Sequence, residues 1–232
     1  MMKRLLAVCV ALALVLGIGA CFSGGYEASP DALSAMEAGA HNGHAQVFMP
    51  EEIRGGLIFY PGGLVDHRAY APLMCLLRDR GILCLLVEMP LDLAVLDMKA
   101  ADGLQELYPR VDRWLIGGHS LGGAMAASYV ADHAQAYEGL VLLGAYSTAD
   151  LSRTELNVLS VYGTQDGVLN REKYEECRRH YPQSFAEVVI DGGCHAYFGD
   201  YGEQKGDGLP AISREEQIRL TADAIAAMLA EE

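Results

Sequence analysis

The stretch Asp112–Tyr129, DRWLIGGHSLGGAMAASY, decides the fold of this chain. It begins with the apolar run 114–116, which has the length of a buried strand, and it ends in an alanine-rich segment that favours a helix. Between the two lies GHSLG at 118–122, a G-x-S-x-G sequence. Placed between a strand and a helix, this motif predicts a sharp, strained turn that exposes the serine hydroxyl above the edge of a sheet.

The chemistry that this turn predicts is nucleophilic. Ser120 is the candidate nucleophile, and the Leu121 amide, one of the first of the helix, is left without an intrahelical acceptor and can bind an oxyanion. Two phosphate-binding motifs fit less well. A dinucleotide motif needs a second glycine where His119 stands, and a P-loop needs lysine where Gly123 stands.

The rest of the chain predicts strands that alternate with helices. The expected strands are 56–60, 82–87, 112–117, 139–143, 157–162 and 186–190, with a further edge strand at 46–49. The expected helices are 68–80, 90–107, the elbow helix to about 133, 171–180 and a last one that starts at Ser213. This alternation predicts an α/β fold, a doubly wound and mostly parallel sheet with helices on both faces. The connection 144–155 is too short for an inserted lid domain.

A serine needs a base and an acid, and both candidates follow late predicted strands. Asp166 follows the strand 157–162, and His195 follows the strand 186–190, a separation of 29 residues that leaves room for one helix and one strand. The order serine, acid, histidine is the one this fold uses. His119 and His67 are rival bases, and Asp66 and Glu88, which also follow strands, are rival acids.

A second oxyanion donor is expected from the loop after the strand 56–60. This loop reads Pro61-Gly62-Gly63-Leu64, and its glycines allow the backbone to approach a substrate oxygen closely. The Gly63 amide is the first candidate and the Leu64 amide the second.

Four segments together carry a family resemblance: FYPGGLVDHRAYAPL, GGHSLGGAMAA, GTQDGV and GGCHAYFGDYGEQKGDG. Over about residues 46–232 the chain resembles the α/β-hydrolase superfamily, and within it a bacterial group of small single-domain hydrolases distantly similar to dienelactone hydrolases. The resemblance implies a hydrolase that acts on ester-like acyl groups. Dienelactone hydrolases use cysteine where this chain has Ser120, and the group often has asparagine where this chain has Cys194.

Composition narrows the partners. The formal net charge is -14, which argues against nucleic acid and against a polybasic membrane patch. The six cysteines have no C-x-x-C spacing, so a zinc site is not expected, and the proposed chemistry needs neither a metal nor an organic cofactor. The sequence chooses no disulfide pairing and no oligomeric state.

The N-terminus predicts export. Residues 1–20 have a short basic start, an apolar run and small residues, the layout of a signal peptide. Ile18-Gly19-Ala20-Cys21 resembles the bacterial lipobox, which implies cleavage before Cys21, lipid on its thiol and a membrane lipoprotein that faces outside the cytoplasm. An ordinary cleaved signal is the alternative. Residues 21–45, rich in Gly, Ser and Ala, are expected to be a flexible tether, and 46–232 the catalytic domain.

These predictions combine into a serine hydrolase that cleaves a small ester-like substrate through an acyl-enzyme on Ser120, with His195 as base, Asp166 as its partner, and the Gly63 and Leu121 amides as oxyanion donors. Two alternatives remain open: a catalytically silent binding module, and an acyltransferase with an acceptor other than water.

Overall fold

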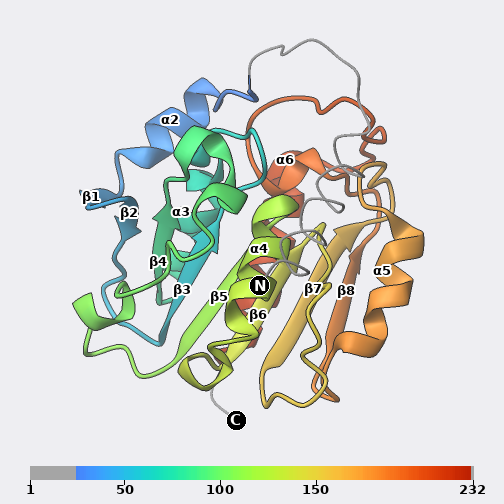
Figure 1. Ribbon diagram of the computed structural model, residues 1–232. Helices are drawn as coiled ribbons and strands as arrows, with labels where there is room; N and C mark the ends of the chain where they lie inside the picture. Colours follow the sequence, from blue (N-terminus) through green and yellow to red (C-terminus); the bar gives the residue numbers. More distant parts are fainter. Residues whose placement is uncertain (1–24, 231–232) are drawn as a thin grey trace.

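The computed structural model describes residues 25–230, and a single sheet organises them (Figure 1). Within this part of the chain the strand order is β1-β2-β4-β3-β5-β6-β7-β8, parallel throughout except where β2 pairs with β1 and β4. The strands are β1 (Ala40–Asn42), β2 (Ala45–Phe48), β3 (Gly55–Tyr60), β4 (Ile82–Val87), β5 (Trp114–His119), β6 (Gly139–Leu143), β7 (Asn157–Gly163) and β8 (Ala186–Ile190). The predicted, mostly parallel sheet is confirmed.

Helices cover both faces of the sheet. They are α2 (Pro30–Met36), α3 (Ala71–Asp79), α4 (Leu121–Val130), α5 (Arg171–Cys177) and α6 (Arg214–Ala227). One apolar core lies between the sheet and α4, and the other lies between the sheet and α2, α3 and α6 (Figure 1). Since β3, β4, β5 and β6 are buried along their whole length, their sequences are continuous apolar or glycine runs rather than alternating ones.

The last helix forms as its sequence predicts. The Ser213 hydroxyl accepts a hydrogen bond from the Glu216 amide at 3.2 Å, which caps the first turn of α6. Four apolar side chains of α6 and the turn that follows it are buried against the core: Ile218, Ala222, Ile225 and Leu229. The connection between β6 and β7 carries no helix, so the predicted absence of an inserted lid holds as well.

The predicted helix over 90–107 is wrong. This segment contains only three short 3₁₀ turns, Pro90–Asp92, Ala94–Leu96 and Gln105–Leu107. Leu91 and Asp92 adopt positive φ angles of 52° and 54°, which a right-handed helix cannot contain. The helix-compatible composition of the segment is therefore overridden at its second residue.

The expectation of a flexible tether over 21–45 differs from the structure wherever residues of that range are described. Ser29 caps α2 through its hydroxyl, and Pro30 occupies the first helical position. Gly39 and the strands β1 and β2 follow, so the chain is folded onto the domain from Tyr26 onward. The predicted signal peptide and Cys21 lie outside the described residues. Between residues 25 and 230, no helix combines the length and the hydropathy that crossing a bilayer requires.

Candidate active site

The turn between β5 and α4 has the strained backbone that the motif predicts. Ser120 adopts φ 52° and ψ -122°, a conformation rare for a residue with a side chain. A Cβ atom at Gly118 would overlap the Tyr60 carbonyl oxygen, and one at Gly122 would overlap the Pro61 carbonyl oxygen. Both glycines are therefore sterically required, and the Ser120 side chain is left partly exposed at the carboxyl end of the sheet.

The structure brings the predicted histidine and acid together. His195 Nδ1 lies 2.9 Å from Asp166 Oδ2, and both side chains are almost completely buried. The second carboxylate oxygen of Asp166 accepts hydrogen bonds from the Val168 and Leu169 amides at 3.0 and 2.8 Å. These contacts fix the orientation of the carboxylate, and the carboxylate in turn fixes the imidazole ring.

Two contacts place the His195 ring next to the elbow. A Cβ atom on Gly144, which has a φ of 52°, would lie 2.8 Å from His195 Nδ1, so the ring packs directly on this backbone position. The preceding residue, Leu143, accepts a hydrogen bond from the Ser120 amide at 2.9 Å. The ring of His119, next to the serine, lies 4.4 Å from the His195 ring between centroids.

The second ring nitrogen of His195, Nε2, is buried and has no hydrogen-bond partner among the described residues. No hydrogen bond therefore joins it to the Ser120 hydroxyl in this structure. Contacts between base and nucleophile are commonly long without substrate and tighten in the reacting complex. A proton acceptor is thus held beside the elbow with no competing donor.

The loop after β3 leaves one of its amides available. The Gly62 amide donates to the Tyr70 hydroxyl at 3.0 Å, and the Leu64 amide donates to the Asp92 carbonyl at 2.8 Å. Within residues 25–230, the amides of Gly63 and Leu121 donate to no acceptor. A Cβ atom on Gly63 would lie 2.8 Å from the Leu121 side chain, so the two predicted oxyanion donors belong to neighbouring residues.

The rival acids are engaged elsewhere. Asp66 caps the 3₁₀ turn His67–Tyr70 and pairs with Arg68, which together hold the pKa of its carboxyl below the usual value although burial alone would raise it. Glu88, the other rival acid, is exposed. Asp200, in the loop that follows His195, pairs with Arg214. None of these carboxylates hydrogen-bonds His195 in the described part of the chain.

The rival base His119 is committed to a different contact. Its Nδ1 lies 2.7 Å from the Tyr70 hydroxyl, whose oxygen also accepts the Gly62 amide. Burial, and then the charge of nearby His195, hold the pKa of His119 well below its ordinary value, so this ring stays neutral. The other rival, His67, lies beside Asp66 in a separate cleft, and burial lowers its pKa.

Tyr70 is a residue of the site that sequence reasoning missed. It lies near the start of the predicted helix 68–80, where an aromatic residue is explained by packing, and it is indeed fully buried. Its hydroxyl nevertheless connects the elbow residue His119 with the oxyanion loop at Gly62. A tyrosine, rather than a phenylalanine, in an apolar stripe was the available signal.

Two further missed residues hold the histidine loop. Asp207 accepts hydrogen bonds from the His195, Ala196 and Gly167 amides at 3.0, 2.8 and 3.1 Å. Burial raises the pKa of Asp207, but these amides outweigh it and the pKa lies below the usual value. The Gln217 side chain accepts a hydrogen bond from the Cys194 amide and donates one to the Cys194 carbonyl oxygen. Burial, followed by the nearby Asp207, raises the pKa of the Cys194 thiol to about 12, so it remains protonated.

The long connection after His195 packs against the domain. Phe198 is fully buried with its ring 5.5 Å from that of His119, and Tyr201 packs on Tyr26 at 5.5 Å. In the described residues the four cysteines are free, and no three His, Cys, Asp or Glu side chains are grouped so that they could hold a metal ion.

Comparison with known proteins identifies the family and the fold of this chain. The model of the alpha/beta hydrolase family matches residues 56–219. Solved structures with the same fold include the esterase domain of a Rhodothermus marinus protein, at a TM-score of 0.59 and 14% identity over 79% of this chain and 90% of that one. Est1E from Butyrivibrio proteoclasticus matches at 0.61 and 15%, over 81% and 94% of the chains.

A monoacylglycerol lipase from Paleococcus ferrophilus matches at a TM-score of 0.61 and 14% identity, over 78% of this chain and 97% of that one. No curated protein matches. The family match covers well over half of the sequence and includes the elbow, the predicted acid and the predicted histidine. This chain belongs to the α/β-hydrolase family.

Proposed function

We propose that the protein is a serine hydrolase that cleaves a small ester-like acyl substrate through an acyl-enzyme on Ser120. The observation that carries the proposal is the buried His195–Asp166 pair, packed on Gly144 beside the strained elbow. An exposed serine on an elbow, a base with a free nitrogen and an oriented carboxylate are the parts that this chemistry needs.

In the proposed mechanism, Ser120 Oγ attacks the substrate carbonyl while His195 Nε2 takes its proton. Asp166 keeps the other ring nitrogen protonated and stabilises the imidazolium. The Gly63 and Leu121 amides bind the oxyanion, and such donors typically contribute about 3 kcal/mol each in the transition state. His195 then protonates the leaving group, and a water molecule releases the acyl group by the same steps in reverse.

The class of substrate is inferred from the fold and from the length of the β6–β7 connection. Two structures with this fold are described as an esterase domain and a monoacylglycerol lipase. The short β6–β7 connection provides no lid over the elbow, which favours small esters or thioesters over long-chain triglycerides. We infer a carboxylester as the substrate.

A fluorophosphonate probe tests the nucleophile directly. We expect one adduct, located on Ser120 by mass spectrometry, and none in a correctly folded Ser120→Ala variant. The same substitution is expected to lower turnover of p-nitrophenyl acetate by roughly 10⁴-fold or more. A folded Ser120→Ala variant that retains near-full turnover refutes the proposal, and an unlabelled wild-type chain indicates a silent module. Product analysis with added alcohols identifies an acyltransferase.

We also propose that the protein is exported and anchored through lipid on Cys21, as the lipobox-like sequence 18–21 implies. The acyl chains each contribute about 0.8 kcal/mol per buried methylene, so several chains hold a protein durably on a membrane. Mass spectrometry of the chain purified from bacterial membranes is expected to show a processed N-terminus with lipid on Cys21. A Cys21→Ser variant should lose the lipid and leave the membrane fraction.

A further inference from the structure

The segment around Tyr26 packs directly on the loop that carries the proposed oxyanion donor. The Tyr26 amide donates to the Leu64 carbonyl at 2.7 Å, and the Asp66 amide donates to the Tyr26 carbonyl at 2.9 Å. Tyr26 and Val65 form a parallel bridge. Backbone hydrogen bonds therefore hold Tyr26 against the segment that follows Gly63.

The same residues also contact the loop that follows His195. The Tyr26 ring packs against Tyr201, its hydroxyl accepts the Lys205 amide at 3.3 Å, and the Ser29 amide donates to the Asp200 carbonyl at 2.8 Å. In Figure 1 the blue start of the chain and the orange connection 196–212 lie at the same end of the sheet. Residues 25–29 thus join both loops of the candidate active site.

Chain length then limits how far this end of the sheet can lie from an anchor on Cys21. Only four residue steps separate Cys21 from Gly25, and an extended chain spans at most about 3.3–3.6 Å per residue, or roughly 14 Å. A free tether over 21–45 would have reached roughly 80 Å on the same scale. Folding of residues 26–45 onto the domain removes most of that freedom.

Exposed leucines lie beside the anchored end. Leu91 is 79% exposed and Leu64 is 38% exposed, and the hydrogen bond from the Leu64 amide to the Asp92 carbonyl holds their loops together. Both leucines have positive φ angles, so the backbone is constrained where it presents them. The neighbouring cleft is rich in carboxylates, from Glu27, Asp66, Glu88 and Asp92, so anionic headgroups are not what attracts this surface.

We propose that lipid on Cys21 holds the carboxyl end of the sheet, with Leu64 and Leu91, against the bilayer, so that Ser120 receives an amphiphilic ester from the membrane interface. The proposal rests on the proposed hydrolase function and on the proposed anchor. In this arrangement the exposed leucines contact lipid. The acyl-ester substrate is then a component of the membrane rather than a freely soluble ester.

Fluorescence quenching in vesicles tests the orientation. The lipidated full-length chain, carrying Cys75→Ser to remove its one partly exposed described thiol, receives Leu91→Cys or, as a matched control, Met49→Cys. Met49 is 46% exposed and follows β2 at the opposite end of the sheet. Each cysteine is labelled with a fluorophore, and the protein is reconstituted into phosphatidylcholine vesicles that contain brominated lipid. We expect the label at 91 to be quenched at least threefold more than the label at 49.

Equal quenching at the two positions overturns the orientation, and so does a chain purified from membranes without lipid on Cys21. This measurement does not depend on catalysis. If the quenching differs as expected but no fluorophosphonate adduct forms on Ser120, the proposed hydrolase function fails while the orientation holds. If Ser120 is labelled and the quenching is equal, the orientation alone fails.

A longer tether tests the source of the substrate. Insertion of 20 Gly and Ser residues between Ser23 and Gly24 restores free reach without changing any described contact. We expect hydrolysis of a medium-chain monoacylglycerol embedded in the vesicles to fall at least fivefold, while turnover of soluble p-nitrophenyl acetate stays unchanged. The same insertion in a Cys21→Ser chain should change neither rate. Unchanged hydrolysis of the embedded ester in the lipidated insertion variant overturns the substrate assignment.

Discussion

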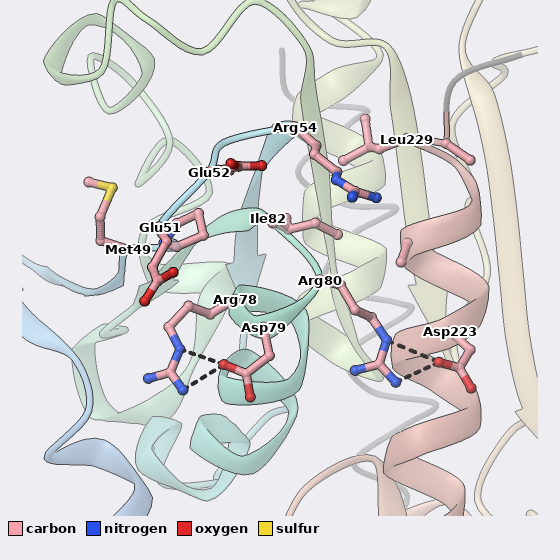
Figure 2. A pocket seen from close by; sticks show the side chains of 14 residues that line it. Met49, Glu51, Glu52, Arg54, Arg78, Asp79, Arg80, Ile82, Asp223 and Leu229 are labelled. Carbon is pink, nitrogen blue, oxygen red and sulfur yellow. Dashed lines mark hydrogen bonds and ion pairs between the residues drawn. The ribbon is translucent and has the colours of Figure 1, made fainter.

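The carboxyl and amino ends of the sheet differ in backbone strain and in the pairing of their polar groups. At the carboxyl end, Ser120, Leu64 and Leu91 hold strained backbone angles, and a buried histidine nitrogen has no hydrogen-bond partner. At the amino end lies a groove of about 970 Å³, shown in Figure 2, where Arg78 pairs with Asp79 and Arg80 pairs with Asp223. The groove with the paired charges therefore lies at the opposite end of the sheet from the strained backbone of the elbow.

The reactive groups lie where the fold enforces strain. Unpaired buried polar atoms and sparsely populated backbone angles cost free energy, and a fold retains them where the surrounding contacts enforce them. The elbow is enforced by Gly118 and Gly122, which pack against carbonyl oxygens of β3 and its loop. Solvent-exposed ion pairs around a groove require no such enforcement, so the volume of the groove is no guide to chemistry.

Loss of the acid should produce the largest effect after loss of the nucleophile. Asp166→Asn removes the charge that stabilises the imidazolium and allows the wrong tautomer of His195, so we expect kcat to fall roughly 10²- to 10⁴-fold. Steady-state kinetics with p-nitrophenyl acetate measure this. Asp191→Asn, at an exposed aspartate four residues before the histidine, is the matched control and should change kcat less than twofold. Equal losses in both variants would contradict the assignment.

Loss of the Tyr70 hydroxyl should have an intermediate effect. Tyr70→Phe leaves the buried Gly62 amide and His119 Nδ1 without their shared partner, which costs about 1–3 kcal/mol. We expect kcat to fall about tenfold with KM nearly unchanged, because the neighbouring Gly63 amide would bind the oxyanion and not the ground state. Tyr201→Phe removes a hydroxyl that, within residues 25–230, bonds only to Gln204, and it serves as control. A rise in KM with unchanged kcat would assign Tyr70 to substrate binding instead.

Asp207 should affect stability in a pH-dependent way. Because its folded pKa lies below the ordinary value of about 3.9, the carboxylate contributes stability at neutral pH and loses this contribution as the pH falls through the folded pKa. Asp207→Asn should therefore have a lower melting temperature than wild type at pH 7, and the gap should shrink below about pH 4. Thermal unfolding at both pH values measures it, and a gap that is independent of pH would show that charge is irrelevant.

Local sequence sufficed where a residue's role is decided by its immediate neighbours. The elbow needs glycines at 118 and 122, and the strand before it is buried along its whole length, so one short stretch predicted nucleophile, turn and sheet together. The pairing of Asp166 with His195 followed from strand order, since side chains after neighbouring parallel strands meet at one edge.

Sequence failed where distant contacts decide. No local motif around Asp207 predicts that its carboxylate accepts hydrogen bonds from amides up to 40 residues away. In the sequence, Tyr70 looks like an ordinary aromatic residue of the core. The tether was misjudged for a different reason. Gly, Ser and Ala suggest flexibility as a composition, but Ser29 followed by Pro30 is also a helix start, and its contact with Asp200 comes from a loop 171 residues later.

The smallest effect on activity and stability is expected from a substitution in the groove at the amino end of the sheet. Arg80→Gln removes the contact of this side chain with Asp223, which Figure 2 shows, and its hydrogen bond to the Leu76 carbonyl. Asp223 keeps Arg219 as a partner at 2.7 Å, and exposed pairs contribute at most about 1 kcal/mol, so the melting temperature should fall by no more than about 4 °C.

Turnover of Arg80→Gln should stay within twofold of wild type, because this groove lies at the amino end of the sheet and the elbow at its carboxyl end. Met49→Gln, which changes the same groove without touching an ion pair, is the matched control for altered solvation. Turnover that falls tenfold in Arg80→Gln but not in Met49→Gln would mean that the two ends are coupled through β4 or α3. In that case the satisfied ion pairs would be part of the catalytic machinery, and backbone strain would no longer separate the reactive end from the inert one.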